Sequence, residues 1–272
     1  MLQILIVIFF SFSTLSKERI VSTVPSLSEI LYELDLSDEV VGVSKYCSFD
    51  EDFCKKDKVG TSLDISYEKI LKLKASAVLL SSSTNKKQVT NLSRLNIRTI
   101  LLEHDRLDDI YKSINILGDT FSKKNEADNL IKKINASLIP DNLEGRAKNV
   151  LFLISSKVKD EKIVKVQAAG SKNFYSDILK HVGMKNILES YPMSYPEVGR
   201  EKLISLKYDY VVEIFGSHNE ASLKEKRSAW KELNDSKEGS IRYVPLVGNY
   251  LFVPGPSVWK IAQELKNKVG KK

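Results

Sequence analysis

The sequence predicts an α/β protein built from two lobes, and three observations support this. Short apolar strand patterns alternate with helical patterns along most of the 272 residues, which is typical of parallel sheets covered by helices on both faces. A helix–strand unit occurs once in each half of the chain. A lysine-rich amphipathic segment separates the halves. We therefore expect two doubly wound α/β lobes joined by a helix.

The repeated unit aligns EKILKLKASAVLL, residues 68–80, with EKLISLKYDYVVE, residues 201–213. Both stretches read as a short helix, a hinge of two residues and a buried strand. Each begins with a glutamate in the first helical turn, Glu68 or Glu201, where negative charge suits the helix dipole. Two similar lobes that each present an acid are more typical of a binding protein docking on a symmetric partner than of a single-site enzyme. Chance similarity is the alternative.

The first lobe is expected over residues 17–121. Pro25 ends its first strand, and Ser26 and Glu29 have the spacing of a capping box at the start of the following helix. The expected strands are residues 20–24, 40–43, 77–80 and 97–102.

The connection is expected over residues 122–145. Residues 122–139 place apolar side chains at helical spacing, and Pro140 and Gly145 end or kink that helix. The second lobe, residues 146–272, restarts the alternation. We expect strands at 150–154 and 243–246, a helix over 174–182 closed by Gly183, and a final helix over 257–268.

Composition restricts the class of protein. With 42% hydrophobic and 28% charged residues, the chain is expected to fold into a packed structure. The net charge of +7 could suggest nucleic acid. However, the lysines are spread along helices and mixed with acids rather than clustered with aromatic residues, which indicates solvated faces and no nucleic-acid partner.

Residues 1–16 are expected to be a secretory signal peptide. Residues 2–10 are apolar except for Gln3, and the run is too short to span a bilayer. Thr14 and Ser16 are small residues at the offsets of a cleavage site, although no basic residue precedes Lys17. A buried strand or a misassigned start are the alternatives. We expect export to the periplasm.

Cys47 and Cys54 are the only cysteines. In an exported protein they could close a local disulfide, and two free thiols are the alternative. No cysteine and histidine spacing suits a structural zinc site, so no metal site is expected.

Catalytic signatures are missing from the sequence. There is no nucleophile elbow and no glycine-rich phosphate loop. The three histidines, His104, His181 and His218, fall on different elements. His104 follows a strand, at the end where α/β folds place ligands, although an exposed loop histidine is the simpler interpretation. We expect a protein that is not an enzyme.

Aromatic and amide side chains follow several strands of both lobes. They are Tyr46, Tyr195, Asn249 and Tyr250. Aromatic walls with a few polar groups suit a flat, partly apolar ligand, although each residue alone could be ordinary loop packing.

Four separated stretches resemble one family: RIVSTVPSLSEIL at 19–31, VGVSKYC at 41–47, SYPEVGRE at 194–201 and PGPS at 254–257. They are similar to periplasmic substrate-binding proteins of the cobalamin, haem and iron-siderophore ABC importers, of the helical-backbone metal receptor type. The resemblance covers about residues 19–268 and is greatest to the vitamin B12-binding members. It implies two lobes joined by one rigid helix, with a ligand cleft between them.

The resemblance also implies residue roles. Glu68 and Glu201 match the acids that dock on arginines of the membrane permease, and Tyr46, Tyr195 and Asn249 match ligand contacts. The chain departs from the vitamin B12-binding pattern at Ser62, Ser81, Gln167 and Val253.

The expected function is therefore capture of a metal chelate, most of all cobalamin or another corrinoid, by a monomer with no resident cofactor. Haem or a ferric siderophore is the alternative ligand, and Tyr46, Tyr195 or His104 would then ligate haem iron. An envelope enzyme and an adhesive envelope protein are the rival classes.

Overall fold

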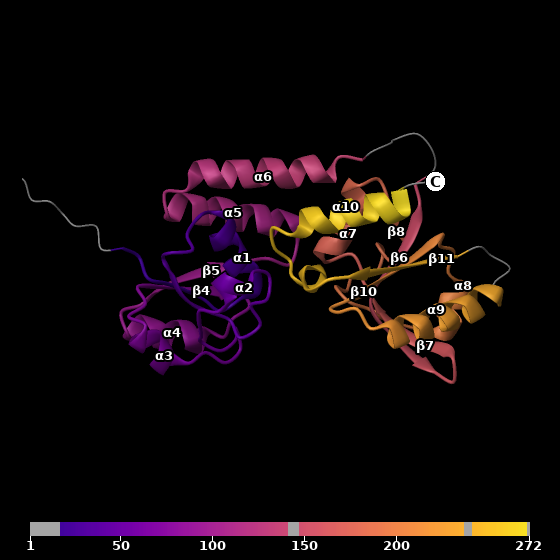
Figure 1. Cartoon of the computed structure of the whole chain (residues 1–272), viewed down its shortest axis with the longest axis horizontal. Coiled ribbons are helices and arrows are strands. Elements are labelled where there is room, and N and C mark those ends of the chain that lie inside the picture. The colour runs from indigo at the N-terminus through magenta and orange to yellow at the C-terminus, as the bar shows by residue number, and fades with distance from the viewer. Residues whose placement is uncertain (1–16, 141–146, 237–240, 271–272) are drawn as a thin grey trace, which may run out of the picture.

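The computed structural model describes residues 17–140, 147–236 and 241–270, and within them two α/β lobes lie below one long helix (Figure 1). The first lobe holds a parallel sheet in the order β3-β2-β1-β4-β5. Its strands are β1 Ile20–Ser22, β2 Val40–Val43, β3 Asp57–Lys58, β4 Ala77–Ser81 and β5 Arg98–Leu102. Its helices are α1 Pro25–Glu33, α2 Glu51–Cys54, α3 Tyr67–Lys72, α4 Lys86–Arg94 and α5 Leu107–Thr120.

The second lobe holds a mixed sheet in the order β11-β10-β6-β7-β9, with β8 paired to β6. Its strands are β6 Asn149–Lys159, β7 Lys162–Ala168, β8 Lys185–Asn186, β9 Glu197–Gly199, β10 Tyr210–Phe215 and β11 Arg242–Val247. Its helices are α7 Phe174–His181, α8 Arg200–Ser205, α9 Glu220–Asp235, the 3₁₀ helix η1 Asn249–Phe252, α10 Val258–Leu265 and the π-helical turn η2 Lys266–Gly270.

The expectation of a purely parallel sheet is wrong for the second lobe. Strand β7 runs antiparallel to both β6 and β9. Strands β6 and β7 are joined by a tight turn in which Asp160 and Glu161 both have positive φ, of 50° and 59°. Such a turn matches the twist of a hairpin and usually contains Asn or Gly. Because this turn has neither, the sequence carries no hairpin signal.

The connecting helix is α6, Lys124–Leu138, slightly shorter than the predicted 122–139. It packs against α5 and α10, so it touches both halves of the molecule (Figure 1). The predicted stop at Gly145 and the predicted signal peptide, residues 1–16, lie outside the described residues. Gly183 closes α7 with φ of 78°, as predicted. No helix within the described ranges is long and apolar enough to cross a membrane.

The capping box predicted at α1 is wrong. Val24 is the N-cap residue and no side chain caps the helix, while Pro25 occupies the first helical turn, where its missing N–H costs nothing. Glu29 therefore does not reach back to the helix start. It is buried and bonds to Ser257, which is 228 residues away in the chain.

Each central strand buries side chains on both faces of its sheet. In β6, Val150 and Phe152 enter one core cluster, whereas Leu151 and Leu153 enter another, beside Trp230 of α9. Alternation of this kind follows from the two-residue period of a strand. Helices therefore cover both faces, which explains the continuous apolar runs that predicted these strands.

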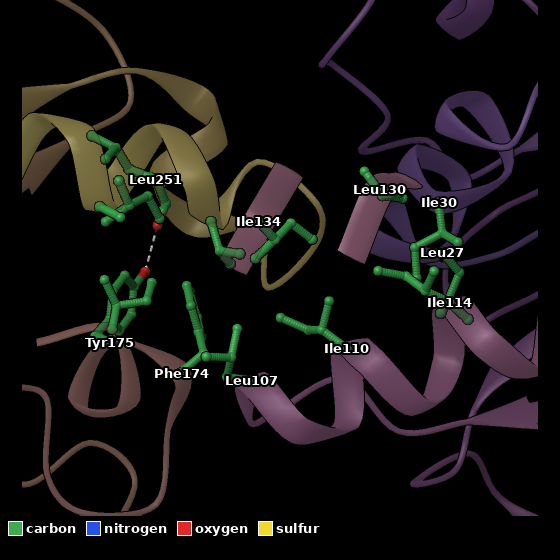
Figure 2. Packing of buried hydrophobic residues seen from close by; sticks show 14 of the residues in the cluster. Leu27, Ile30, Leu107, Ile110, Ile114, Leu130, Ile134, Phe174, Tyr175 and Leu251 are labelled. Atoms are coloured by element: carbon green, nitrogen blue, oxygen red, sulfur yellow. Dashed lines mark hydrogen bonds between the residues drawn. The ribbon is translucent and has the colours of Figure 1, made fainter. Parts of the chain in front are cut away.

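One apolar core runs through both lobes (Figure 2). Leu27 and Ile30 of α1 and Ile110 and Ile114 of α5 belong to the same cluster as Ile134 of α6. The cluster continues into the second lobe through Phe174, Tyr175, Leu251 and Ile261. Separating the lobes would expose this surface to water, at about 25 cal/mol per Å² of apolar area.

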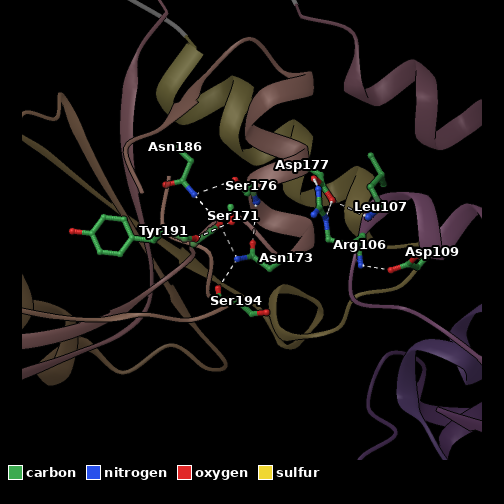
Figure 3. A network of polar contacts seen from close by, with 11 residues as sticks. Arg106, Leu107, Asp109, Ser171, Asn173, Ser176, Asp177, Asn186, Tyr191 and Ser194 are labelled. Atoms are coloured by element: carbon green, nitrogen blue, oxygen red, sulfur yellow. Dashed lines mark hydrogen bonds and ion pairs between the residues drawn. The ribbon is translucent and has the colours of Figure 1, made fainter. Parts of the chain in front are cut away.

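Two polar links also join the lobes. Asp177 of α7 accepts hydrogen bonds from the Arg106 side chain, with Nε 2.7 Å from Oδ2, and from the Leu107 backbone N–H at 3.1 Å (Figure 3). The second link joins Glu29 of α1 to Ser257, just before α10. The lobes are therefore held by a shared core and by hydrogen bonds at two places.

Candidate functional site

Loops that follow the strands carry large apolar side chains exposed to solvent. Tyr46 follows β2 and is 63% exposed, and Leu63 follows β3 and is 85% exposed. In the second lobe, Met193, Tyr195 and Phe252 are exposed by 41–57%. Exposed apolar side chains that are scattered singly are common on protein surfaces, whereas a contiguous group marks a binding surface. Ligands of α/β folds bind at the carboxyl ends of parallel strands.

Tyr195 faces the first lobe. Burial raises the pKa of its hydroxyl, and the carboxylate of Asp105, on the loop after β5, raises it further. Asp105 belongs to the first lobe and Tyr195 to the second, so these loops approach each other across the molecule.

The loop that carries Tyr195 is fixed by hydrogen bonds. The backbone oxygen of Ser194 accepts from the Gly170 N–H at 2.9 Å and from the Asn173 side-chain amide at 2.6 Å (Figure 3). A Cβ at position 170 would overlap the carbonyl oxygen of Met193, so only glycine fits there. Neither Gly170 nor Asn173 was predicted to support the site, because no local sequence pattern marks their contacts with Ser194 and Met193.

The predicted residues Asn249 and Tyr250 lie on different sides of η1. Asn249 and Phe252 both approach Gly216 at the end of β10, and an added Cβ there would lie 3.3 Å from Asn249 Oδ1. Tyr250 instead contacts α10, with its hydroxyl 3.3 Å from Glu264 Oε1 and its ring 5.6 Å from Lys260 Nζ. In a 3₁₀ helix, residues i and i+3 share a face, which separates Tyr250 from the pair.

Tyr175 supports η1 from below. Its hydroxyl donates to the backbone oxygen of Leu251 at 2.5 Å (Figure 2), and Tyr195 lies close enough to contribute to raising its pKa. Tyr175 itself is buried, so it holds η1 in place and does not contribute to the exposed surface. Tyr46 lies in the first lobe, and the Nζ atom of Lys45 is 5.0 Å from the centroid of its ring.

His104 is more enclosed than a loop histidine is expected to be. Its side chain is 16% exposed, and neither ring nitrogen has a hydrogen-bond partner among the described residues. Burial lowers its pKa, although Asp105 and Asp109 act in the opposite direction. The imidazole is therefore neutral near pH 7. No group of three or more His, Cys, Asp or Glu side chains in the described ranges could hold a bare metal ion.

Glu68 and Glu201 occupy equivalent places in the two lobes. Both are exposed and lie in the first turn of a short helix, α3 or α8. Each helix leads into a central strand, β4 or β10, that pairs with the first strand of its lobe. The two sequence repeats thus adopt the same arrangement, and α3 and α8 lie toward opposite ends of the molecule (Figure 1).

Cys47 and Cys54 form a disulfide, with their Cα atoms 5.4 Å apart. The bridge closes the loop between β2 and α2, next to Tyr46. Disulfides of this kind persist in oxidising compartments outside the cytoplasm.

Comparison with known proteins identifies the family. The chain matches the family model of the periplasmic binding proteins over residues 20–229. It belongs to that family. It is 28% identical over 237 residues to the uncharacterized ABC transporter substrate-binding lipoprotein YvrC of Bacillus subtilis, covering 82% of this chain and 72% of YvrC.

One further sequence relative and one solved structure are also similar to this chain. The chain is 27% identical over 208 residues to the high-affinity heme uptake system protein IsdE of Staphylococcus aureus, covering 74% of this chain and 68% of IsdE. The periplasmic heme-binding protein HutB of Vibrio cholerae superposes with a TM-score of 0.75 at 19% identity, covering 94% of this chain and 100% of HutB. The expected two-lobe α/β fold is confirmed by this superposition, and membership of the periplasmic binding proteins rests on the family match.

Proposed function

We propose that this periplasmic binding protein captures a flat metal tetrapyrrole between its lobes, with a corrinoid such as cobalamin as the first candidate. The observation that carries the proposal is the set of exposed apolar side chains on loops of both lobes: Tyr46, Leu63, Met193, Tyr195 and Phe252. Exposed aromatic and apolar side chains on loops of both lobes suit a flat, partly apolar ligand held between the lobes. The protein would bind and release without chemistry.

Affinity would come mainly from burial of these side chains, since fully burying a large apolar side chain contributes about 1.5–3 kcal/mol. The corrinoid candidate rests on the sequence stretches shared with vitamin B12-binding proteins. Ser81, where that pattern has a tryptophan, is buried against Ser83 at 2.9 Å. With serine in place of tryptophan at position 81, the first lobe offers less aromatic surface to the ligand. This favours a ligand that binds more weakly than cobalamin or has a different shape.

Haem is the second candidate, and two observations favour it. One relative is named as a haem uptake protein. His104 is largely buried, and neither ring nitrogen has a hydrogen-bond partner among the described residues. Burial lowers its pKa, which favours the neutral form that ligates iron. Tyr46 and Tyr195 are the other candidates for the axial position.

The first experiment mixes residues 17–272 with cyanocobalamin or, separately, with hemin, and removes free ligand by gel filtration. The corrinoid proposal predicts a cobalamin spectrum that co-elutes at one ligand per protein. A shifted Soret band with hemin alone would establish the second candidate. The variants Tyr46→Phe, Tyr195→Phe and His104→Ala would then identify the axial residue. Tyr250→Phe is the matched control, because Tyr250 contacts α10. Two colourless proteins would refute the tetrapyrrole proposal.

Delivery would use Glu68 and Glu201 as the points that dock on basic residues of the permease. Their support is the sequence resemblance together with their exposure at equivalent places in the two lobes. The double variant Glu68→Arg with Glu201→Arg is expected to abolish uptake while ligand affinity stays unchanged. Glu220→Arg is the control, because Glu220 is also an exposed acid in a first helical turn. Normal uptake by the double variant would refute the docking assignment.

Capture would take place outside the cytoplasm. The predicted signal peptide and the disulfide between Cys47 and Cys54 support export. YvrC is named as a lipoprotein of the same importer class.

A further inference from the structure

The segment between η1 and α10, residues 253–257, crosses from the second lobe to helix α1 of the first, and we call it the strap. The backbone N–H of Ser257 donates to Glu29 Oε1 at 3.1 Å, and the Ser257 hydroxyl donates to the same oxygen. Both residues are buried, Glu29 to 4% exposure and Ser257 to 2%. The strap is thus tied to the first lobe through one carboxyl group.

The strap is also packed tightly onto α1. A Cβ at Gly255 would lie 2.6 Å from Glu29 Oε2 and 3.3 Å from the Cα of Ser26. A larger residue at position 255 would displace the Glu29 carboxyl group and crowd the backbone of α1. The glycine thus permits the close approach of the strap to Glu29.

The strap continues directly from the ligand wall. Asn249 and Phe252 lie on η1, whose middle is held to the second lobe by the Tyr175 hydroxyl on the Leu251 oxygen. The far end of the same stretch is held to the first lobe by Glu29. Residues 253–257 therefore connect Phe252 directly to the hydrogen bonds at Glu29.

Charged groups of two helices, α1 and α10, act on the carboxyl group of Glu29. Burial raises the pKa of its carboxyl group from 4.5 to about 7, and Glu33, one turn further along α1, raises it too. The Ser257 hydrogen bonds and Lys260 of α10 lower it. Glu33 in turn pairs with Lys133 of α6 at 3.5 Å. The net result is a carboxyl group that prefers to be neutral in this enclosed site.

We propose that Glu29 and Ser257 form a proton-dependent link between the lobes, which positions the strap and, through it, the ligand wall that carries Asn249 and Phe252. The link deepens the proposed function, and only its effect on the ligand rests on that function. Glu29 is a positioning residue here, since it acts through the strap and does not touch the ligand.

The direction of the pH effect follows from linkage. When the link opens and water reaches Glu29, its carboxyl group returns toward its ordinary acidity. The closed link then binds the proton more tightly than the open one, so closure is favoured at low pH. With the two pKa values above, the ratio of closed to open link falls about tenfold between pH 6 and pH 8.

The test measures amide hydrogen exchange at Ser257 in the ligand-free protein between pH 5 and pH 8. It compares the wild type with Glu29→Gln, which keeps the shape of the side chain but cannot ionise. Because the intrinsic exchange rate is the same in both at each pH, their ratio isolates the link. Wild-type protection relative to Glu29→Gln is expected to fall about tenfold from pH 6 to pH 8. Glu33→Gln, the matched control, keeps a pH-dependent profile.

Equal pH profiles for the wild type and Glu29→Gln would overturn the proposal. Should Glu29→Gln fold poorly, Ser257→Ala gives a second test, because it keeps the backbone donor and removes the hydroxyl that lowers the pKa of Glu29. In Ser257→Ala, the loss of amide protection is expected at a higher pH than in the wild type. Loss of protection at the same pH as in the wild type would also overturn the proposed link.

The ligand arm uses cyanocobalamin or hemin, whichever binds in the mixing experiment. Wild-type affinity is expected to fall from pH 6 to pH 8 relative to Glu29→Gln. Parallel affinity profiles with a pH-dependent exchange profile would refute the positioning role and leave the link. Failure of both ligands to bind would count against the proposed function only, since the exchange arm needs no ligand.

Discussion

The two polar links between the lobes, Arg106–Asp177 and Glu29–Ser257, both join the lobes but differ in their exposure to water. The guanidinium of Arg106 is 43% exposed, so its ion pair with Asp177 is open to water and salt. Glu29, by contrast, is 4% exposed and meets a neutral serine. An exposed ion pair contributes little and is screened, whereas a buried carboxyl group is costly to charge. The first link should therefore respond to salt and the second to protons.

The largest expected effect is the pH dependence of stability due to Glu29. Its pKa is raised in the folded protein to about 7, above the ordinary value of 4.5. The neutral form thus favours folding, so its contribution is full below pH 4.5 and is lost as pH rises through 7. The difference amounts to about 3 kcal/mol over that window. Urea unfolding at pH 5 and pH 8 should show wild type losing stability relative to Glu29→Gln.

If the unfolding free energies of wild type and Glu29→Gln differ by the same amount at pH 5 and pH 8, Glu29 ionises as easily in the folded chain as in the unfolded one. The link at Glu29 would then not respond to protons. Glu33→Gln again serves as the control, because Glu33 is half-buried and already paired with Lys133.

A smaller effect is expected from Asp177. The variant Asp177→Ala removes the acceptor of the Leu107 backbone N–H, and Leu107 is 1% exposed. A buried donor left without a partner costs about 1–3 kcal/mol. Asp177→Asn keeps an acceptor oxygen and should lose less. Thermal or urea unfolding measures both, and equal losses would show that charge rather than the backbone hydrogen bond matters there.

The smallest effect is expected from Arg106→Ala. Since the guanidinium is partly exposed, the ion pair should contribute about 1 kcal/mol or less. The loss should shrink further in 1 M salt, because the charges are then screened. A double-mutant cycle with Asp177→Ala measures the pair directly. A coupling that is large and independent of salt would show that this link is as well shielded as the one at Glu29.

Local patterns predicted the first lobe better than the second. In the first, strands at 20–24, 40–43, 77–80 and 97–102 were expected, and β1, β2, β4 and β5 occupy those places. In the second, β7 was missed because the turn that joins it to β6 lacks glycine and asparagine, and β9 was missed because it has only three residues. Short strands depend on their neighbours for stability, so a local pattern alone cannot specify them.

The candidate site shows a similar division. Tyr46 and Tyr195 lie on loops, as predicted, and Asn249 begins η1 shortly after β11. Tyr250 was grouped with Asn249 by proximity in the chain, yet the 3₁₀ turn of η1 directs it to α10. The ligand role of all four residues stays a prediction until binding is measured.

Local sequence patterns were enough to predict the alternation of strands and helices, the repeated unit that begins at Glu68 and Glu201, and the connecting helix. Each of these depends on periodicity and on interactions within a few residues. The folded structure was needed to show that Glu29 bonds to Ser257 rather than capping α1, and that Asp177 pairs with Arg106. Those partners lie 228 and 71 residues apart, and contacts at such separations form only when the shared core has packed the lobes together.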